Sequence, residues 1–369
     1  MFRRVSQIWF VPFLLFLSMA KCTFGETDPA KSIMTAQPDD SISEHSGSEG
    51  FDAGAMILDH ISDSHEWHFF TIERKDGTEF HGSICLPVIL FTPGVGWNAF
   101  SFHNLHHPQV YKGFALDEEQ HIVRTDGKKF YDFSLTKNVI QMMIAVALML
   151  LIFLSVARNY KKYGSGKAPR GLTSVVEVIV IFIRDGVAKP MLGERANRYL
   201  PFLLTVFFFI WINNLLGLIP GSANVTGNIA VTATLAGITF ILMMVGSRKH
   251  FWSHMVAPPG VPVAVLPILI PIEFLSNLIV KPVALMIRLF ANMLAGHLIV
   301  LSFMAIIFIF AGKSLGAGLG ASVFSVAFTI FIYMLELLVA ALQAYIFTIL
   351  SALFIGETGH VAHHKNDLL

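Results

Sequence analysis

Several polar side chains lie within two long apolar segments near the C-terminus, at 263–311 and 321–355. Arg288, His297, Glu336 and Gln343 are of types that hold charge or pass protons. A charged side chain at the centre of a bilayer costs from about 2.5 to more than 10 kcal/mol, depending on the system. A lone histidine there is often a helix-packing hydrogen bond, whereas an arginine in mid-span indicates a function that involves charge.

The spacing of these four residues predicts two polar layers. A Gly-rich stretch, 312–320, separates the apolar segments and predicts a reversal of the chain. Residues equally far from the reversal lie at one level of an antiparallel hairpin. This places Arg288 level with Gln343, and His297 level with Glu336.

Helical angles separate the two layers further. Asn292 follows Arg288 by four residues and shares its face. His297 follows Arg288 by nine residues and faces the opposite way at about 100° per residue. Because Glu336 lies at a different depth, we expect Arg288 to meet a carboxylate from another chain.

The whole chain has the composition of a membrane protein. Of its 369 residues, 54% are hydrophobic and 14% are charged, and the net charge is +1. A soluble domain of this length carries far more charge. The charge balance indicates no nucleic-acid partner. The sequence has no Gly-rich phosphate loop and no zinc-type cysteine pair, so we expect no cofactor and no metal.

The N-terminus has the pattern of a secretory signal. Arg3 and Arg4 precede the apolar run Ile8 to Ala20, which is short for a membrane span. We expect a signal peptide at 1–25; an uncleaved first membrane helix is the alternative.

The next segment, 26–135, is expected to be an extracytoplasmic extension. Asp76-Gly77 and Asp126-Gly127 each lie between strand-like runs, which predicts two β-hairpins.

A membrane domain is expected at 136–357, followed by a cytoplasmic tail at 358–369. Five apolar stretches reach the length of about 20 residues that a membrane helix needs. They lie at 138–157, 199–219, 229–247, 263–311 and 321–355. The amphipathic segment 172–189 predicts an interfacial helix. The expected fold is an all-α polytopic membrane protein, with five membrane helices, this interfacial helix, and the last two helices long and tilted as a hairpin.

Basic residues predict the orientation of the membrane domain. Lys and Arg are frequent in 158–198 and begin 248–260, whereas 220–228 has neither. The positive-inside rule therefore places 158–198, 248–260 and the C-terminus in the cytoplasm.

Three stretches closely resemble the a subunit of rotary F-type ATP synthases. They are "NNLLGLIPG" at 213–221, "KPVALMIRLFANMLAGHLIV" from Lys281, and "LELLVAALQAYIFTIL" from Leu335, and the resemblance covers about 137–357. It implies a static proton guide beside a rotating ring of c subunits, each of which carries a buried carboxylate. It also implies no catalytic site in this chain, a b-subunit peripheral stalk as partner, and a bacterial inner membrane with lipid around the helices.

The resemblance also implies roles for individual residues. Arg288 matches the family's essential arginine, Asn292 its neighbouring asparagine, and Gln343 its glutamine on the last helix. His297 and Glu336 match a proton-relaying couple in the outer half-channel. Asn214 matches a polar residue at the outer entrance; Glu273, with Ser276 nearby, resembles the acidic residue at the cytoplasmic end.

Two other classes of protein fit parts of the sequence. A secondary antiporter or channel without a ring would also hold Arg, His and Glu in membrane helices. A membrane enzyme with a histidine-bound metal is the other, since His65 and His68 have a spacing that suits zinc on a helix. The neighbouring Trp67 and Phe69 favour an interfacial segment there instead.

Overall fold

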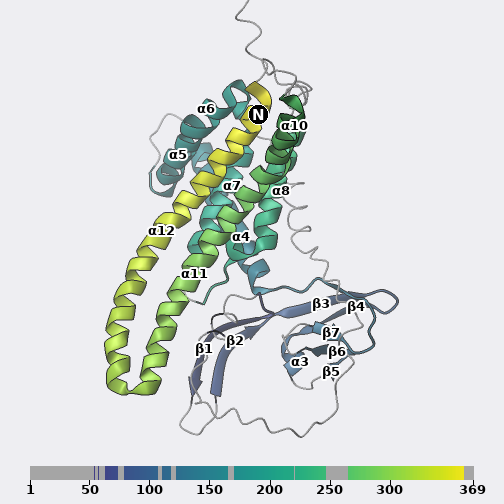
Figure 1. Cartoon of the computed structure of the whole chain (residues 1–369), viewed down its shortest axis with the longest axis vertical. Coiled ribbons are helices and arrows are strands. Elements are labelled where there is room, and N and C mark those ends of the chain that lie inside the picture. Colours follow the sequence, from purple (N-terminus) through teal and green to yellow (C-terminus); the bar gives the residue numbers. More distant parts are fainter. Residues whose placement is uncertain are drawn as a thin grey trace, which may run out of the picture. The chain divides into compact units, whose positions relative to one another are not determined.

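Figure 1 shows a computed structural model of the chain. It describes residues 54, 57, 63–73, 79–106, 110–117, 122–164, 170–219, 221–246 and 265–360. The predicted signal peptide and most of the predicted tail lie outside these residues. The described chain forms two compact units, one of 141–298 with 331–360 and one of 54–140 with 299–330.

The region before the first long helix is built from β-strands. Its elements are β1 (Glu66–Glu73), β2 (Glu79–Cys85), β3 (Pro87–Thr92), β4 (Gly96–Ser101), α3 (His103–His106), β5 (Val110–Tyr111), β6 (Phe114–Leu116), β7 (Ile122–Arg124) and β8 (Tyr131–Asp132). β1 and β2 pair antiparallel, with Glu66 opposite Cys85 and Glu73 opposite Glu79. The helix considered for a zinc site at His65 and His68 is wrong, because β1 begins at Glu66. The interfacial position expected for this segment stays a prediction.

Two three-stranded sheets follow, in the orders β4-β3-β8 and β5-β6-β7. Side chains from both pack into one apolar core, which consists of Val88, Leu90, Phe100, Phe102, Leu105, Phe114 and Ile122. This core gives the region its own hydrophobic centre, independent of the long helices.

The second predicted hairpin, around Asp126-Gly127, is wrong. β7 pairs with β6, whereas β8 pairs with β3 in the other sheet. The turn itself forms, since Gly127 has a φ of 62° and its N–H donates to Arg124 O at 3.2 Å. The chain then runs three more residues before β8 and pairs with β3, so the turn ends β7 without forming a hairpin.

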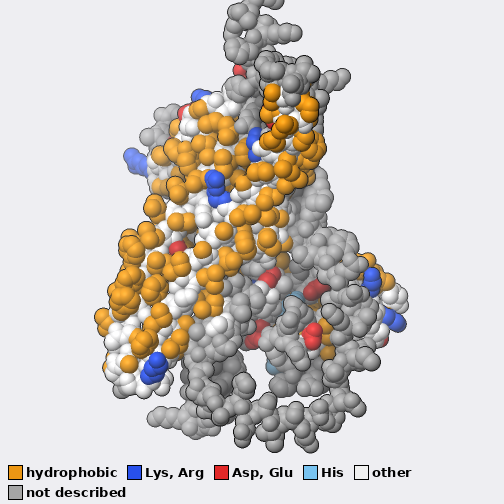
Figure 2. Space-filling model, in the orientation of Figure 1, with side chains coloured by type: hydrophobic (Ala, Val, Ile, Leu, Met, Phe, Trp, Pro, Cys, Tyr) orange, Lys and Arg blue, Asp and Glu red, His pale blue; other side chains and the backbone are white. Residues whose placement is uncertain are grey.

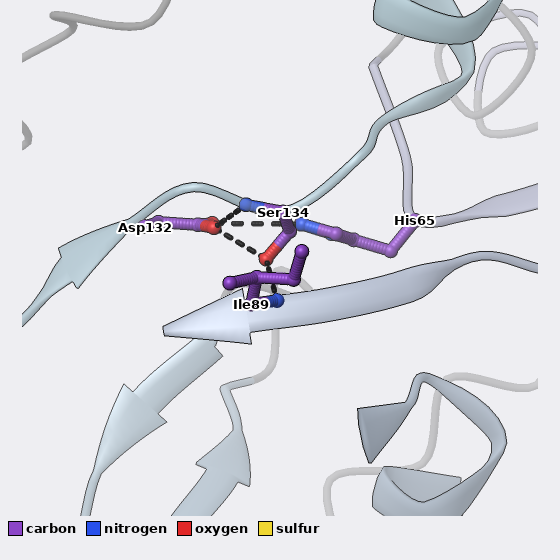
Figure 3. A network of polar contacts seen from close by, with 4 residues as sticks. All are labelled: His65, Ile89, Asp132 and Ser134. Carbon is purple, nitrogen blue, oxygen red and sulfur yellow. Dashed lines mark hydrogen bonds and ion pairs between the residues drawn. The ribbon is translucent and has the colours of Figure 1, made fainter. Parts of the chain in front are cut away.

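A polar cluster fastens the end of β8 to the rest of this region (Figure 3). Asp132 Oδ1 accepts hydrogen bonds from the backbone N–H and the hydroxyl of Ser134, and its Oδ2 lies 3.5 Å from His65 Nε2. The Ser134 hydroxyl in turn accepts from Ile89 N at 3.1 Å. Asp132 lies between the serine and the histidine, so the serine is not activated as a nucleophile and the cluster acts as a structural clasp.

The helices after this region begin with α4 (Lys137–Tyr163). The remaining elements are α5 (Leu172–Ile183), η1 (Arg184–Ala188), α6 (Lys189–Leu192), η2 (Gly193–Arg195), α7 (Ala196–Gly217), η3 (Val225–Gly227), α8 (Ile229–Gly246), α10 (Leu266–Leu275), η4 (Ser276–Val280), α11 (Lys281–Lys313) and α12 (Leu315–His360). The π-helical turns η1 and η4 join α5 to α6 and α10 to α11 without a break.

Among the described residues, four helical stretches are long and apolar enough to cross a membrane: 137–162, 172–217, 266–313 and 316–356. The predicted polytopic α-helical membrane region is therefore confirmed. The apolar helix α8 is shorter than these four. The predicted interfacial segment 172–189 forms α5 and η1 and the start of α6, and its position at a membrane surface stays a prediction.

α11 and α12 form the long hairpin that the Gly-rich stretch predicted, and they run antiparallel in Figure 1. The reversal is tighter than expected, because α11 ends at Lys313 and α12 begins at Leu315. A Cβ on Gly318 would lie 2.8 Å from Ala311 Cα, so a glycine is required where the helices meet.

Small residues recur every four positions on the buried face of α12. Ala340, Ala344, Thr348, Ala352 and Gly356 are all buried. Such a stripe lets helix backbones approach closely, which is the main source of helix association in a membrane. At its end, a Cβ on Gly356 would overlap the carbonyl of Met191 on α6.

We expect Gly356→Ala to destabilise the packing of α12, because the added methyl group meets a backbone carbonyl that cannot turn away. Overpacking of this kind costs about 1–3 kcal/mol. Gly320→Ala is the matched control on the same helix, since nothing lies within 4 Å of its added Cβ. Thermal unfolding of the purified protein in detergent measures both; equal melting temperatures for the two variants would contradict the close contact.

The clasp predicts a pH dependence for the β-rich region. Although burial opposes it, hydrogen bonds from His65 and Ser134 hold the pKa of the Asp132 carboxyl below its usual value. A carboxyl with a lowered pKa adds stability above its unfolded pKa of about 3.9, and this is lost as the pH falls through the lower folded pKa. Asp132→Asn should therefore lower the melting temperature at pH 5, with a difference from wild type that shrinks toward pH 2. A difference that does not change with pH would show that the charge is unimportant.

Candidate functional site

Arg288 lies on α11 and its side chain is exposed. The exposed neighbours on its own helix face are small, with Ala284 and Ala291 on either side. Within the part of the chain that the structure describes, the guanidinium forms no hydrogen bond and no ion pair. The charge therefore has no carboxylate partner among the described residues.

The amides of Asn292 and Gln343 join α11 to α12 one turn beyond Arg288. Asn292 Nδ2 donates to Gln343 Oε1 at 2.8 Å, and Gln343 is only 2% exposed. The hairpin geometry thus brings Gln343 to the level of Asn292, close to the level predicted for Arg288. An amide pair in this place fixes the two helices in register next to the arginine.

Glu336 is buried on α12, and its carboxylate lies against Gly296 of α11. A Cβ on Gly296 would overlap Glu336 Oε1, so only a glycine leaves room for this carboxylate. Oε1 has no hydrogen-bond partner among the described residues. A buried carboxylate oxygen without a partner favours the binding of a water molecule.

His297 follows Gly296 directly and faces α7. Its Nε2 lies 3.1 Å from Gly217 O. Three polar side chains of α11 therefore lie in different surroundings, since Arg288 is exposed, Asn292 bonds to α12, and His297 faces α7. The predicted divergence of Arg288 and His297 matches this arrangement.

Asn214 is completely buried on α7, and both ends of its amide are engaged. Nδ2 donates to Ala340 O at 3.3 Å, and Oδ1 accepts from the Thr226 hydroxyl at 2.7 Å. It thereby ties α7 to α12, one turn beyond Glu336, and to η3. Its expected place near the outer entrance stays a prediction.

Glu273 and Ser276 lie on the other side of Arg288 along the helix axis. Glu273 is half-buried on α10, and Ser276 begins the π-turn η4. Glu273 precedes Arg288 by fifteen residues, or about 22 Å, whereas His297 follows it by nine, or about 13 Å. The structure therefore does not bring Glu273 together with His297 and Glu336, and Arg288 lies between them.

Comparison with known proteins identifies the family of this chain. The family model for the ATP synthase A chain matches residues 139–356, which contain every residue of the candidate site. The chain belongs to the ATP synthase A chain family. Relatives named ATP synthase subunit a include one from Chloroherpeton thalassium, 48% identical over 241 residues, which cover 64% of this chain and 69% of the relative. ATP synthase subunit a 2 of Chlorobium luteolum is 38% identical over 349 residues, 91% of this chain and 85% of the relative.

The region before this ATP synthase domain matches a second family model, described as a domain of unknown function (DUF8433), at residues 56–141. The two matches overlap at 139–141, in the first turns of α4. The β-rich region is thus a recognised module that continues directly into the first long helix.

In this ATP synthase subunit, the residues that hold the loop after α7 were not predicted from the sequence. The Gln141 amide accepts from Ala223 N at 2.7 Å and donates to Ala223 O at 2.5 Å. Asn224 Nδ2 donates to Met293 O at 3.2 Å. A glutamine in the apolar start of α4 indicates a buried hydrogen-bond partner, but the spacing of residues does not show which residue that partner is.

We expect Gly296→Ala to displace the Glu336 carboxylate and to slow ion-driven ATP synthesis about tenfold, equivalent to about 1.4 kcal/mol in the barrier. Glu336→Asp in the same chain shortens the acid by one methylene and should restore part of the rate. Gly312→Ala is the control on the same helix, since its added Cβ has open space. The rates are measured in vesicles that hold the purified complex; a double variant no faster than Gly296→Ala would contradict the contact.

Proposed function

We propose that this chain is the stator subunit of the Fo sector that guides protons through two offset half-channels, and that Arg288 acts on the carboxylates of a rotating c ring. The observation that carries this proposal is the exposed guanidinium of Arg288, which has no partner within the described chain. The chain's membership of the ATP synthase A chain family supports the proposal, because an ATP synthase has other subunits from which a partner can come.

The surroundings of Arg288 support a partner of opposite charge within the membrane. Figure 2 shows an orange surface over α10, α11 and α12. Its exposed members include Ile268, Ile272, Ile287, Leu338 and Leu342. Arginine stays charged at any working pH, and a lone charge on an apolar face is costly. A ring carboxylate next to Arg288 would remove this cost while the carboxylate is ionised. When the carboxylate is protonated, it would no longer be held by the arginine.

The outer half-channel is assigned to the layer of Glu336 and His297, with Asn214 as the residue that fixes its wall. An imidazole titrates near neutral pH, and a buried carboxylate with a free oxygen can exchange a proton with it through water. A proton delivered here neutralises the ring carboxylate, which then enters lipid.

The inner half-channel is assigned to Glu273 and Ser276. Their separation from the His297 layer keeps the two paths apart, and the fixed charge of Arg288 opposes direct proton leakage between them. Asn292 and Gln343 hold the two helices beside the arginine. We assign the c ring and a b-subunit peripheral stalk as partners, and the bacterial inner membrane as the location, with the N-terminal segment outside and the C-terminus in the cytoplasm.

We expect Arg288→Lys and Arg288→Ala each to abolish most proton-driven ATP synthesis. Lysine keeps the charge but loses the planar five-donor group, whereas alanine loses both. Arg198→Lys, at an exposed arginine of α7, is the matched control and should keep the wild-type rate. Synthesis by the purified complex is measured in vesicles under separate H⁺ and Na⁺ gradients, which also identifies the ion. Normal rates in Arg288→Ala vesicles would rule out the assigned role.

A further inference from the structure

The sheet β4-β3-β8 has one face that the core does not use. Side chains alternate between the faces of a strand, so Val88, Leu90 and Phe100 point into the core. The register places Phe91 opposite both Trp97 and Tyr131, on the other face.

This second face is apolar and largely uncovered; its residues are Ile89, Phe91, Trp97, Ala99, Tyr131 and Phe133. Trp97 is 64% exposed, Tyr131 51% and Phe133 46%. The rings form a continuous surface, since the ring centres of Phe91 and Trp97 are 4.9 Å apart and those of Trp97 and Phe133 are 5.4 Å apart. We call these six residues the aromatic face.

A sheet face that meets water is normally polar. Four neighbouring aromatic rings on such a face indicate an interaction surface, because exposed apolar patches of this kind are otherwise aggregation sites. The partner must accept both apolar rings and the hydroxyl and indole N–H of Tyr131 and Trp97.

The aromatic face is fastened next to the start of a membrane helix. Phe133 N donates to Ile89 O at 2.8 Å, and Leu135 N to Pro87 O at 3.2 Å. Lys137 N, at the first residue of α4, donates to Ser64 O at 3.1 Å, and Asn138 N lies 3.3 Å from Asp63 Oδ1. Phe133 is four residues from Lys137, which limits their separation to about 14 Å.

We propose that the aromatic face docks on the lipid headgroup region of the membrane, on the side where α4 enters it. Tryptophan and tyrosine concentrate at this depth, where their rings meet acyl chains and their polar atoms meet water. Exposed Lys128 and Lys129 precede β8 and would contact anionic headgroups. This inference depends on α4 crossing the membrane and not on the ion path.

The test measures quenching of Trp97 fluorescence by brominated lipids in the full chain reconstituted into phosphatidylcholine vesicles. The chain has five tryptophans, so the signal of Trp97 is the difference between wild type and Trp97→Phe. We expect this difference signal to be strongly quenched by bromines close to the headgroup, less by bromines deep in the bilayer, and weakly by aqueous iodide.

A tryptophan at position 110 of the other sheet is the control. The Val110→Trp/Trp97→Phe variant places an exposed indole on β5, outside the aromatic face, and it should respond mainly to iodide. Replacing part of the lipid with phosphatidylglycerol should protect Trp97 further from iodide, and Lys128→Ala/Lys129→Ala should remove this added protection. Each lysine should change the ratio of docked to undocked aromatic face about fivefold.

Two outcomes would overturn the proposal. In the first, iodide quenches Trp97 in vesicles as readily as it quenches the indole at position 110, and bromolipids do not. In the second, Trp97 is protected only in the assembled complex, which would make the partner a protein. Ion-driven ATP synthesis that is lost in Arg288→Ala but kept in Trp97→Phe separates this proposal from the function of the membrane helices.

Discussion

An unpaired positive charge on an apolar helix face is the constraint on which the arrangement of the membrane helices depends. Among the described residues, the Arg288 guanidinium has no hydrogen bond and no ion pair. The Glu336 carboxylate lies at another level of the hairpin, against Gly296. In the proposed function the neutralising group comes from another chain, and a carboxylate whose charge can be switched by a proton meets that requirement.

The close approach of the helices fixes where the buried polar side chains find their partners. Gly296 leaves space for a carboxylate, and the small residues of α12 let its backbone approach α7 and α6. The buried polar groups then find partners in backbone carbonyls, as Asn214 does at Ala340. Packing and polar chemistry are thus set by the same small side chains, because a larger one would separate the helices and leave the polar groups unpaired.

Patterns along the chain predicted the parts that depend on local rules. Apolar length predicted the long helices, equal distance from the turn predicted the level of Glu336 near His297, and the motif around Arg288 predicted the family. The pairing of β8 with β3 was missed, because the turn at Gly127 is local whereas the choice of a partner strand depends on the core around Leu90 and Phe114. The bonds of Gln141 to Ala223 were missed for the same reason, since they join residues 82 positions apart.

The π-turn η4, between Glu273 and Arg288, holds one residue more per turn than regular helix would. Each residue of an α-helix rotates the following side chain by about 100° around the axis. Deleting one residue from 276–280 would restore an ordinary helix and swing the acidic end of α10 to another side, while the Asn292–Gln343 bond holds α11 beside α12. The π-turn therefore sets the direction of Glu273 around the helix axis independently of the direction of Arg288.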